Sequence, residues 1–401
     1  MLELEEAQSL LLARVHPLPE EEIDLSEACG RILASSVRAP VDLPPFDNSA
    51  MDGYAVRSED TAKASKDNPA TLELIGRTVA GDDMGAALEP QSCQRVFTGS
   101  VLPPQTTAVV MQEDTEKDPT QPQRIRVLDP VRPWENVRLR GEDVKAGEEI
   151  LREGERLNPQ KIALASALGL PRLLVHRKPI IGLIATGNEL AEPGAKLLPG
   201  QIFESNRVCL AAMLESAGAS PKVYPIVRDE LDATRAALQK AFEECDAVVS
   251  SGGVSVGEMD YVKKALEEIG GELVFWKVAI KPGRPFVFGQ LQERFFFGLP
   301  GNPVSAFVTF LLLVRPVVLK LQGASEPMLP VLPGVLLEPL SNNGDRRHFV
   351  RVHVDTEGKV SCPGQQASHL LGSLAKANGL IDVPPRSVIS AGASVRVLCT
   401  G

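Results

Sequence analysis

The chain has 401 residues, of which 43% are hydrophobic and 23% are charged, and its formal net charge at pH 7 is -10. This length exceeds one compact core, so we expect two to four domains of a soluble globular protein. The negative charge argues against general nucleic-acid binding, because such binding requires a basic face. The six cysteines form no C-x-x-C pair, so neither a zinc site nor a disulfide framework is indicated.

Neither a signal peptide nor a membrane span is expected. The N-terminus carries Glu3, Glu5 and Glu6 where a signal peptide would carry positive charge. The longest apolar stretch, Val304 to Val318, contains an arginine and a proline and falls short of a membrane span. We therefore expect a cytoplasmic protein.

The first part of the chain predicts helices and then a β-rich region. Residues 2–15 have helical spacing, residues 17–22 interrupt it, and a second helix is expected to end near Gly30. From Val41 to about Arg140 prolines, glycines and short β-type runs dominate, which is typical of a small inserted β domain. The runs are Thr71 to Ile75, Arg95 to Thr98, Ala108 to Met111 and Arg124 to Val127.

The rest of the chain predicts a central α/β sheet followed by another β region. A helix is expected after Asn158, with Gly169 as its C-terminal cap. Strands then alternate with helices from Lys178 to about Gly323, as in a mainly parallel sheet. After about Pro327 the pattern is that of a small barrel or sandwich. The expected strands of the sheet are Ile180 to Ala185, Lys222 to Val227, Ala247 to Ser250, Leu273 to Ile280 and Phe295 to Gly298.

One segment, from Asp246 to Tyr261, combines an apolar strand, a glycine-rich turn and two carboxylates. Gly252 and Gly253 allow the backbone to take positive φ or to approach a ligand. The helix expected after the turn would present N–H groups to an anion such as phosphate. An ordinary strand-to-helix turn with solvated acids is the alternative for this segment alone.

Other strands of the sheet also end in polar residues. Glu189, Asp229 and Asp260 each follow a strand, so they are expected at one edge of the sheet, where parallel α/β sheets bind ligands. A cluster of carboxylate oxygens suits magnesium. These loops contain no histidine or cysteine, which argues against zinc catalysis and against a catalytic triad.

Basic residues are expected near the same edge. Lys277 and Lys281 would share one face of a regular strand, and Arg284 follows a Pro-Gly turn. In an acidic protein such a local cluster marks the place of an anion. Asn302-Pro303, before an apolar helix, is a second candidate anion cradle.

These motifs, together with Phe46 to Val56, resemble the MoeA family of molybdopterin molybdenumtransferases, whose relatives include the E domain of gephyrin. The likeness covers essentially the whole chain, with every motif in the family's order. The further motifs are Phe97 to Gly99, Arg140 to Asp143, Thr186 to Leu190, Ser250 to Tyr261, Lys281 to Gly283 and Leu299 to Ser305.

The resemblance implies molybdenum cofactor synthesis: insertion of molybdate into adenylylated molybdopterin, with Mg²⁺-dependent cleavage of the adenylate and release of AMP. It implies an α/β multidomain fold whose central domain resembles the molybdopterin adenylyltransferase fold. A homodimer with a shared active site is also implied, with molybdopterin adenylyltransferase and molybdoenzyme acceptors as possible further partners. The implied domains are 1–17 with 177–325 (α/β), 18–44 with 141–176 (connecting), 45–140 (inserted, β-rich) and 326–401 (C-terminal β-barrel).

The resemblance also assigns residues to roles. Magnesium binding is implied for Glu189 and Asp260, and catalytic roles for Asp52, Thr98, Asp143, Asp229, Lys277 and Lys281. Of these, Asp52, Thr98 and Asp143 would come from the partner subunit. Substrate binding is implied for Gly252, Gly253, Ser255, Pro282, Pro300, Gly301, Asn302, Pro303, Ser305, Arg351 and Ser368, the last two as molybdate contacts.

Two positions depart from the family's pattern. Asn188 stands where many relatives have aspartate, so it is not counted as a ligand. Arg284 replaces a common lysine, which keeps the charge but presents a planar fork of donors. A non-catalytic scaffold and a molybdopterin adenylyltransferase are the competing functions, and the carboxylate set and the flanking β-rich regions argue against them.

Overall fold

The computed structural model describes residues 1–118, 120–253 and 261–400, and the chain forms two compact units. The first unit consists of Met1–Ser35, Glu153–Asn158 and the chain from Arg172 onwards. The second consists of Ser36–Arg152 and Pro159–Pro171. Each unit is described by itself below.

A six-stranded sheet forms the centre of the first unit, with the order β16-β13-β17-β21-β20-β18. The first four strands are parallel neighbours, and β20 pairs antiparallel with both β21 and β18. The predicted α/β sheet is thereby confirmed, with an antiparallel edge. The strands are β13 (Ile180–Ala185), β16 (Ser220–Val223), β17 (Ala247–Ser251), β18 (Glu272–Trp276), β20 (Val287–Leu291) and β21 (Arg294–Leu299).

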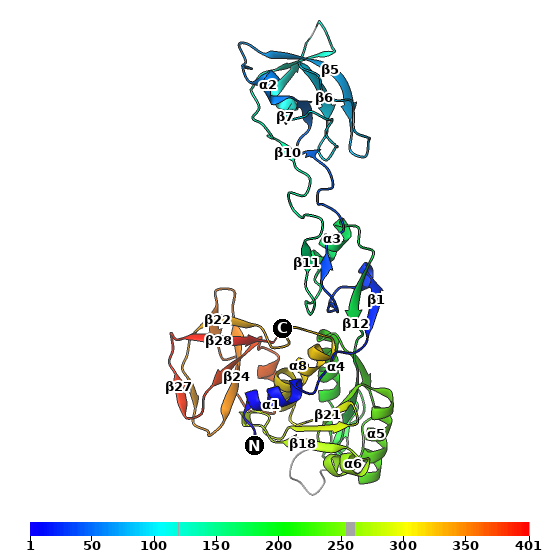
Figure 1. Cartoon of the computed structure of the whole chain (residues 1–401). Helices are drawn as coiled ribbons and strands as arrows, with labels where there is room; N and C mark the ends of the chain where they lie inside the picture. Colours follow the sequence, from blue (N-terminus) through cyan, green and yellow to red (C-terminus); the bar gives the residue numbers. More distant parts are fainter. Residues whose placement is uncertain (119, 254–260, 401) are drawn as a thin grey trace. The chain divides into compact units, whose positions relative to one another are not determined.

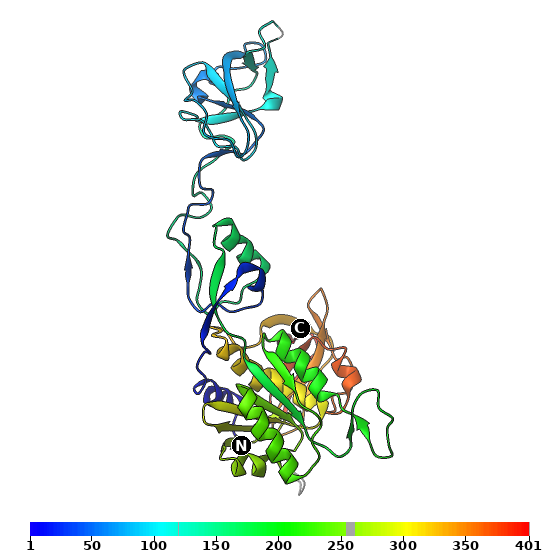
Figure 2. The same cartoon turned by 90° about the vertical axis from the view of Figure 1, so that its right-hand side faces the viewer.

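Helices cover both faces of this sheet (Figures 1 and 2). All five residues of β17 are buried, as expected of a strand covered on both sides. One face packs against α1 (Leu4–Leu12), α4 (Asn206–Ser216), α7 (Pro303–Thr309) and α8 (Arg315–Leu321). The other face packs against α5 (Leu231–Glu244) and α6 (Val262–Glu268).

A buried π-helical segment, Phe310–Val314, joins α7 to α8. Pro316 follows it and has no N–H, so the regular i to i-4 hydrogen bond to Leu312 cannot form there. The continuous helical stretch Pro303–Leu321 has 19 residues, so it is long and apolar enough to cross a membrane. It is longer than the apolar stretch Val304 to Val318 that the sequence indicated. Its most apolar window is 83% buried inside the fold, as in the core helix of a globular domain.

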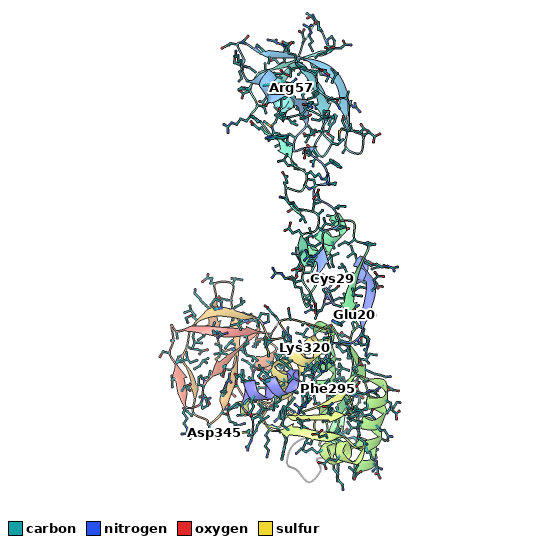
Figure 3. All side chains as sticks on the ribbon, in the orientation of Figure 1. Glu20, Cys29, Arg57, Phe295, Lys320 and Asp345 are labelled. Atoms are coloured by element: carbon teal, nitrogen blue, oxygen red, sulfur yellow. The ribbon has the colours of Figure 1, made fainter. Side chains whose placement is uncertain are left out.

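Phenylalanines fill the core beside the antiparallel edge of the sheet. Phe295, labelled in Figure 3, is the second residue of β21 and stacks on Phe288 with ring centroids 6.0 Å apart. Phe288 in turn contacts Phe275 and Phe297, both at 5.6 Å. These aromatic contacts hold β18, β20 and β21 together.

The C-terminal part of the first unit is a closed five-stranded barrel, as β24 pairs with both β25 and β26. The prediction of a barrel or sandwich is thereby resolved in favour of the barrel. Short β19 (Ile280–Lys281) pairs with β24 in parallel and links the barrel to the sheet region. The strands are β22 (Val331–Leu336), β24 (Arg347–Val354), β25 (Lys359–Ser361), β26 (Gly379–Val383) and β28 (Ser394–Cys399).

The predicted second helix near Gly30 is wrong. The chain forms strand β1 (Glu20–Asp24) and then only a short 3-10 turn, Leu25–Glu27. β1 pairs antiparallel with β12 (Arg172–His176), so a strand 148 residues away in sequence overrides the local helical pattern.

The second unit contains a six-stranded sheet with the order β7-β4-β6-β5-β9-β8. A buried apolar cluster, which includes Val56, Leu72 and Ile125, forms its core. Helix α3 (Pro159–Ala167) starts at the predicted position after Asn158. The strands are β4 (Gly53–Val56), β5 (Ala70–Thr78), β6 (Ser92–Val96), β7 (Ala108–Met111), β8 (Thr115–Lys117) and β9 (Arg124–Val127).

Candidate functional site

A cavity of about 660 Å³ lies at the carboxyl ends of the parallel strands in the first unit. The crossover after β13 leads through α4 to β16 on one side, whereas β17 lies on the other side of β13. Such a reversal of strand order opens the crevice in which α/β sheets bind ligands. The cavity brings together eight residues of the predicted site: Glu189, Asp229, Gly252, Gly253, Pro300, Gly301, Asn302 and Pro303.

The turn after β17 requires its two glycines. Gly252 has φ +90°, and a Cβ there would lie 2.8 Å from the carbonyl oxygen of Thr186. Gly253 has φ +68°, and its Cβ would lie 2.8 Å from Oγ1 of the same threonine. Thr186 Oγ1 is buried, lies in the wall of the cavity and has no hydrogen-bond partner within the described residues. The turn therefore brings backbone and an unused hydroxyl close to the cavity.

Two carboxylates reach the cavity from neighbouring loops. The N–H of Asn188 donates to Oδ2 of Asp229 at 3.1 Å, and the N–H of Asp229 donates back to Oδ1 of Asn188 at 3.3 Å. This reciprocal pair links the ends of β13 and β16, and Glu189 follows directly. Within residues 1–118, 120–253 and 261–400, no group of three acidic, histidine or cysteine side chains is arranged to hold a metal ion. Two carboxylates nevertheless suit Mg²⁺, which takes one or two together with water and substrate phosphates.

Asn206 was missed by the sequence analysis, although it ties three walls of the cavity together. Its Nδ2 donates to Ser251 Oγ at 2.7 Å and to the carbonyl of Gly301 at 2.8 Å. It thereby joins the start of α4 to the ends of β17 and β21. An asparagine before an apolar helix is common at helix starts, so its type alone could not indicate this role.

A buried ion pair holds the same helix start. Glu204 Oε1 accepts from the N–H groups of Asn206 (2.7 Å) and Arg207 (2.9 Å), and its Oε2 pairs with Arg207 Nε at 3.1 Å. The side chains of Glu204 and Arg207 are only 2% and 5% exposed. Arg207 also donates to the carbonyl of Tyr224 and to both oxygens of Glu192.

The expectation that Lys277 and Lys281 share a strand face is wrong. β18 ends at Trp276, and Lys277 has φ +76°, so the strand does not stay regular. Lys277 Nζ lies 3.7 Å from the Trp276 ring centroid, whereas Lys281 is exposed on β19. Neither lysine lines the cavity, but Pro285, which follows Arg284, does. Pro282 is buried in the turn between Lys281 and Arg284.

The start of α7 offers fewer free donors than predicted. Pro303 has no N–H, and the N–H of Val304 donates to the carbonyl of Ser368 at 3.1 Å. Ser305 is buried beneath the helix start rather than in the cavity wall. The contact with Ser368 brings the barrel's loop to the cavity, where His369 and Leu371 complete the wall.

Arg351 holds this loop through hydrogen bonds to its backbone. It is fully buried, and its Nη2 donates to the carbonyls of Gln365 and Ala367 and to Ser373 Oγ. Its Nε and Nη1 are buried without partners within the described part of the chain, and burial lowers the pKa of its guanidinium. Two donors of Arg351 are therefore unused, although they do not face the cavity.

The second unit holds the remaining predicted catalytic residues. Thr98 donates from both its N–H and its Oγ1 to Asp52 Oδ1, each at 2.8 Å. The Thr98 N–H holds the pKa of Asp52 below its usual range. Asp143 is exposed, and its N–H donates to the carbonyl of Leu43 at 3.1 Å. Ser255 and Asp260 lie outside the described residues.

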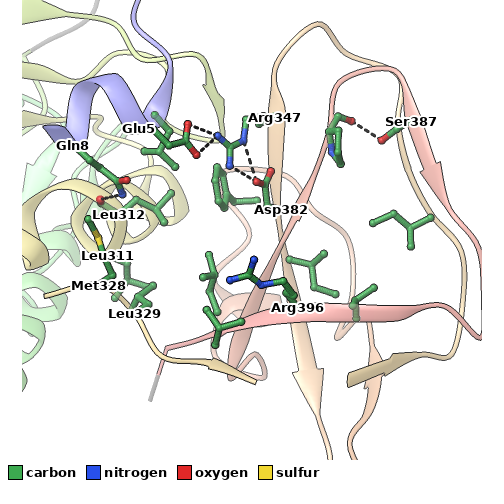
Figure 4. Close-up of a pocket in the computed structure, with 18 of the residues that line it drawn as sticks. Glu5, Gln8, Leu311, Leu312, Met328, Leu329, Arg347, Asp382, Ser387 and Arg396 are labelled. Atoms are coloured by element: carbon green, nitrogen blue, oxygen red, sulfur yellow. Dashed lines mark hydrogen bonds and ion pairs between the residues drawn. The ribbon is translucent and has the colours of Figure 1, made fainter. Parts of the chain in front are cut away.

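A second cavity, of about 730 Å³, lies between α1, the π-helical segment and the barrel (Figure 4). Its wall is mainly aliphatic. Three of its four charged side chains already pair with one another, since Arg347 binds Glu5 at 2.5 and 2.7 Å and also binds Asp382; the fourth is Arg396. The sheet-edge cavity, with its glycine turn and carboxylates, is thus the candidate site for phosphate and metal chemistry.

Three family models match the chain in order: the MoeA N-terminal region (domains I and II) at residues 2–169, a probable molybdopterin binding domain at 182–320 and the MoeA C-terminal region (domain IV) at 333–399. The molybdopterin molybdenumtransferase of Haemophilus influenzae is 37% identical over 99% of this chain and 98% of its own length. Molybdopterin molybdenumtransferase 2 of Mycobacterium tuberculosis is 37% identical over 99% of each chain. The crystal structure of the molybdopterin biosynthesis MoeA protein from Pyrococcus horikoshii OT3 superposes with a TM-score of 0.85 at 32% identity, covering all of both chains.

Proposed function

Since the chain belongs to the MoeA family of molybdopterin molybdenumtransferases and serves molybdenum cofactor biosynthesis, we propose that it inserts molybdate into adenylylated molybdopterin, with Mg²⁺-dependent cleavage of the adenylate and release of AMP. The observation that carries this proposal is the sheet-edge cavity. It combines two carboxylates, a glycine turn and the Pro300–Pro303 loop within about 660 Å³. A cavity of this size suits a substrate of several rings.

Magnesium fits the donor set of this cavity. Glu189 and Asp229 supply hard oxygen donors. We add Asp260 as a third ligand, because the family resemblance of the sequence implies this role. When bound, the ion would neutralise charge on the phosphate oxygens of the adenylate. Cleavage of a phosphoanhydride depends mainly on such positioning and charge neutralisation, so the proposed reaction does not require a Ser-His-Asp triad.

The chain's own residues would hold and orient the substrate. We assign phosphate binding to the turn of Gly252 and Gly253, whose backbone approaches the cavity. We assign Lys277 and Lys281 to anionic groups of the substrate beyond the cavity wall. We assign Ser368 and Arg351 to molybdate, since Arg351 holds the loop that carries Ser368 through the carbonyls of Gln365 and Ala367. Molybdate or water would then open the adenylate.

We further propose a cytoplasmic homodimer with shared active sites. Asp52, Thr98 and Asp143 of the partner subunit would complete the site formed by Glu189 and its neighbours. The bonds between Asp52 and Thr98 support this role, because they lower the pKa of the carboxyl group and occupy Oδ1, not Oδ2. A molybdopterin adenylyltransferase would supply the substrate, and molybdoenzymes would accept the product.

The test is to incubate the purified chain with adenylylated molybdopterin, molybdate and magnesium and to measure AMP. We expect AMP release that requires both molybdate and magnesium, and a Glu189→Gln variant that is at least about 100-fold slower. As a control, Glu192→Gln changes an exposed acid that does not line the cavity.

Two other results would point to other functions. A scaffold would release no AMP under any of these conditions. An adenylyltransferase would consume ATP and release pyrophosphate with unmodified molybdopterin. Either result from the wild-type chain would overturn the proposed reaction.

A further inference from the structure

Two arginines lie side by side on the sheet of the second unit. In the pairing of β5 with β6, Arg77 lies opposite Arg95, and in the pairing of β4 with β6, Arg95 lies opposite Tyr54. Phe97 is two residues beyond Arg95, so it points to the same side of the chain. We call Arg77, Arg95 and Phe97 the arginine ledge.

Aromatic rings support both guanidinium groups. Arg95 Cζ lies 4.9 Å from the Tyr54 ring centroid and 5.0 Å from that of Phe97, and Arg77 Cζ lies 5.9 Å from the Phe97 ring. Tyr54 is only 5% exposed and forms a rigid base, whereas Arg95 is half-buried and Arg77 is exposed. Stacking occupies the flat face of a guanidinium and leaves the N–H donors at its rim for an anion.

Few of these donors are used inside the unit. Arg95 Nη2 donates to Gln112 Oε1 at 2.5 Å, and the side chain of Arg77 makes no hydrogen bond or ion pair within the residues that the structure describes. If the ledge served only to cover the end of the core, aliphatic stems and rings would suffice. Two stacked arginines with spare donors are instead typical of phosphate recognition.

The ledge adjoins the predicted catalytic pair. Thr98 follows Phe97, and the N–H of Gln112, the partner of Arg95, donates to the backbone carbonyl of Asp52 at 3.0 Å. Positive charge of two guanidiniums is thus concentrated beside Asp52 and Thr98, in a chain whose net charge is -10. Such a local field attracts an anion to this end of the sheet.

We propose that Arg77 and Arg95 bind the phosphate group of the nucleotide portion of the substrate. This inference rests on the proposed function and adds two binding residues to it. The ligand class is a phosphate ester such as a nucleoside monophosphate, recognised through its charged oxygens rather than through its base.

The first experiment measures binding to the full chain by calorimetry, with AMP, inorganic phosphate and adenosine as separate probes. We expect Arg77→Ala and Arg95→Gln each to weaken AMP binding about tenfold, because each removes a charge-assisted hydrogen bond. Inorganic phosphate should lose affinity in the same variants. The matched control is Arg126→Ala, which removes an arginine paired with Glu116 on neighbouring strands of the same sheet.

Three outcomes would overturn the inference: AMP binding that is unchanged in both variants, equal losses in the Arg126→Ala control, or an adenosine affinity that falls as much as that of AMP. A thermal melt of Arg95→Gln checks folding, because its side chain packs on Tyr54. Arg77 is exposed, so its variant keeps the test valid if the other variant unfolds.

Turnover separates this inference from the reaction itself. If the wild type releases AMP and both variants raise KM about tenfold, the two proposals stand together. If the wild type releases AMP and both variants keep its KM, only the ledge fails. If the wild type releases no AMP, the reaction fails, and the calorimetric comparison still decides whether the ledge binds phosphate.

Discussion

His348 is a buried histidine among cations. Only 7% of it is exposed, its Nε2 has no partner within the described residues, and the charges of Lys281, Arg351 and Arg346 act on it. Burial, reinforced by these cations, lowers the pKa of His348 from an ordinary 6.5 to about 4. The folded chain therefore keeps this imidazole neutral at pH values where the unfolded chain protonates it.

This difference predicts an acid-dependent loss of stability. As the pH falls below 6.5, the unfolded chain binds the proton first, so the free energy of unfolding decreases until about pH 4 and then no longer changes through this group. We expect the group to contribute about 2 to 3 kcal/mol to that decrease. Urea unfolding of wild type and His348→Phe at pH 7 and pH 4.5 measures it.

The variant should lose less stability than the wild type between these pH values. His353→Phe is the control, since His353 lies exposed on the same strand. An equal pH dependence in wild type and His348→Phe would show that the imidazole does not titrate as described.

Site residues whose role depends on local backbone conformation were predictable from the sequence, whereas residues whose role depends on partners distant in the sequence were not. The glycines of the turn were predictable, because few other residues tolerate φ +90° with backbone 2.8 Å away. Asn206 was not, because its partners Ser251 and Gly301 are 45 and 95 residues away. Lys277 was misplaced because nothing in a run of β-type residues indicates a positive φ.

At the level of elements, the start of α4 depends on one buried acid. Glu204 is 2% exposed and holds Arg207, whereas Glu192 binds the same arginine from the surface and is 59% exposed. Removing one partner of a buried pair leaves the other charge uncompensated, which costs about 3 to 5 kcal/mol. An exposed pair contributes about 1 kcal/mol or less.

We therefore expect Glu204→Gln to lower the free energy of unfolding by about 3 kcal/mol and Glu192→Gln by less than about 1 kcal/mol. Urea denaturation of the two variants gives the comparison. Similar losses in both would mean that the buried carboxylate does not hold the helix start.

Regular periodicity made most elements of the sheet predictable. β13 has the predicted bounds, Ile180–Ala185. β16 was expected to extend to Val227 but ends at Val223, since Pro225 follows closely and has no N–H for the ladder. β20 was missed because its pairing with β18 and β21 depends on contacts that local pattern does not encode.

At the scale of the whole molecule, the proposed homodimer with shared sites predicts complementation between inactive variants. Asp52→Ala and Glu189→Ala should each abolish activity alone. In a mixed dimer one site would combine an intact Glu189 with the partner subunit's Asp52. If half of the dimers are mixed, activity should return to about a quarter of the wild-type value.

Refolding the two variants together and measuring AMP release tests this arrangement. A mixture of Asp52→Ala with Thr98→Ala is the control, because both changes fall in the same unit and no mixed site would be intact. If the first mixture stays as inactive as its components, each site is formed within a single chain.

The N-terminal helix α1 has a consequence for synthesis on the ribosome. Its contacts are with the last third of the chain: Gln8 donates to the carbonyl of Leu312, and Glu5 binds Arg347, 342 residues later. Helix α1 therefore leaves the ribosome about 300 residues before the segments that it contacts, whereas the second unit, Ser36–Arg152 with Pro159–Pro171, forms its contacts within itself. A nascent chain arrested before residue 312 would leave the apolar face of α1 uncovered, which makes this helix a natural target for chaperones during translation.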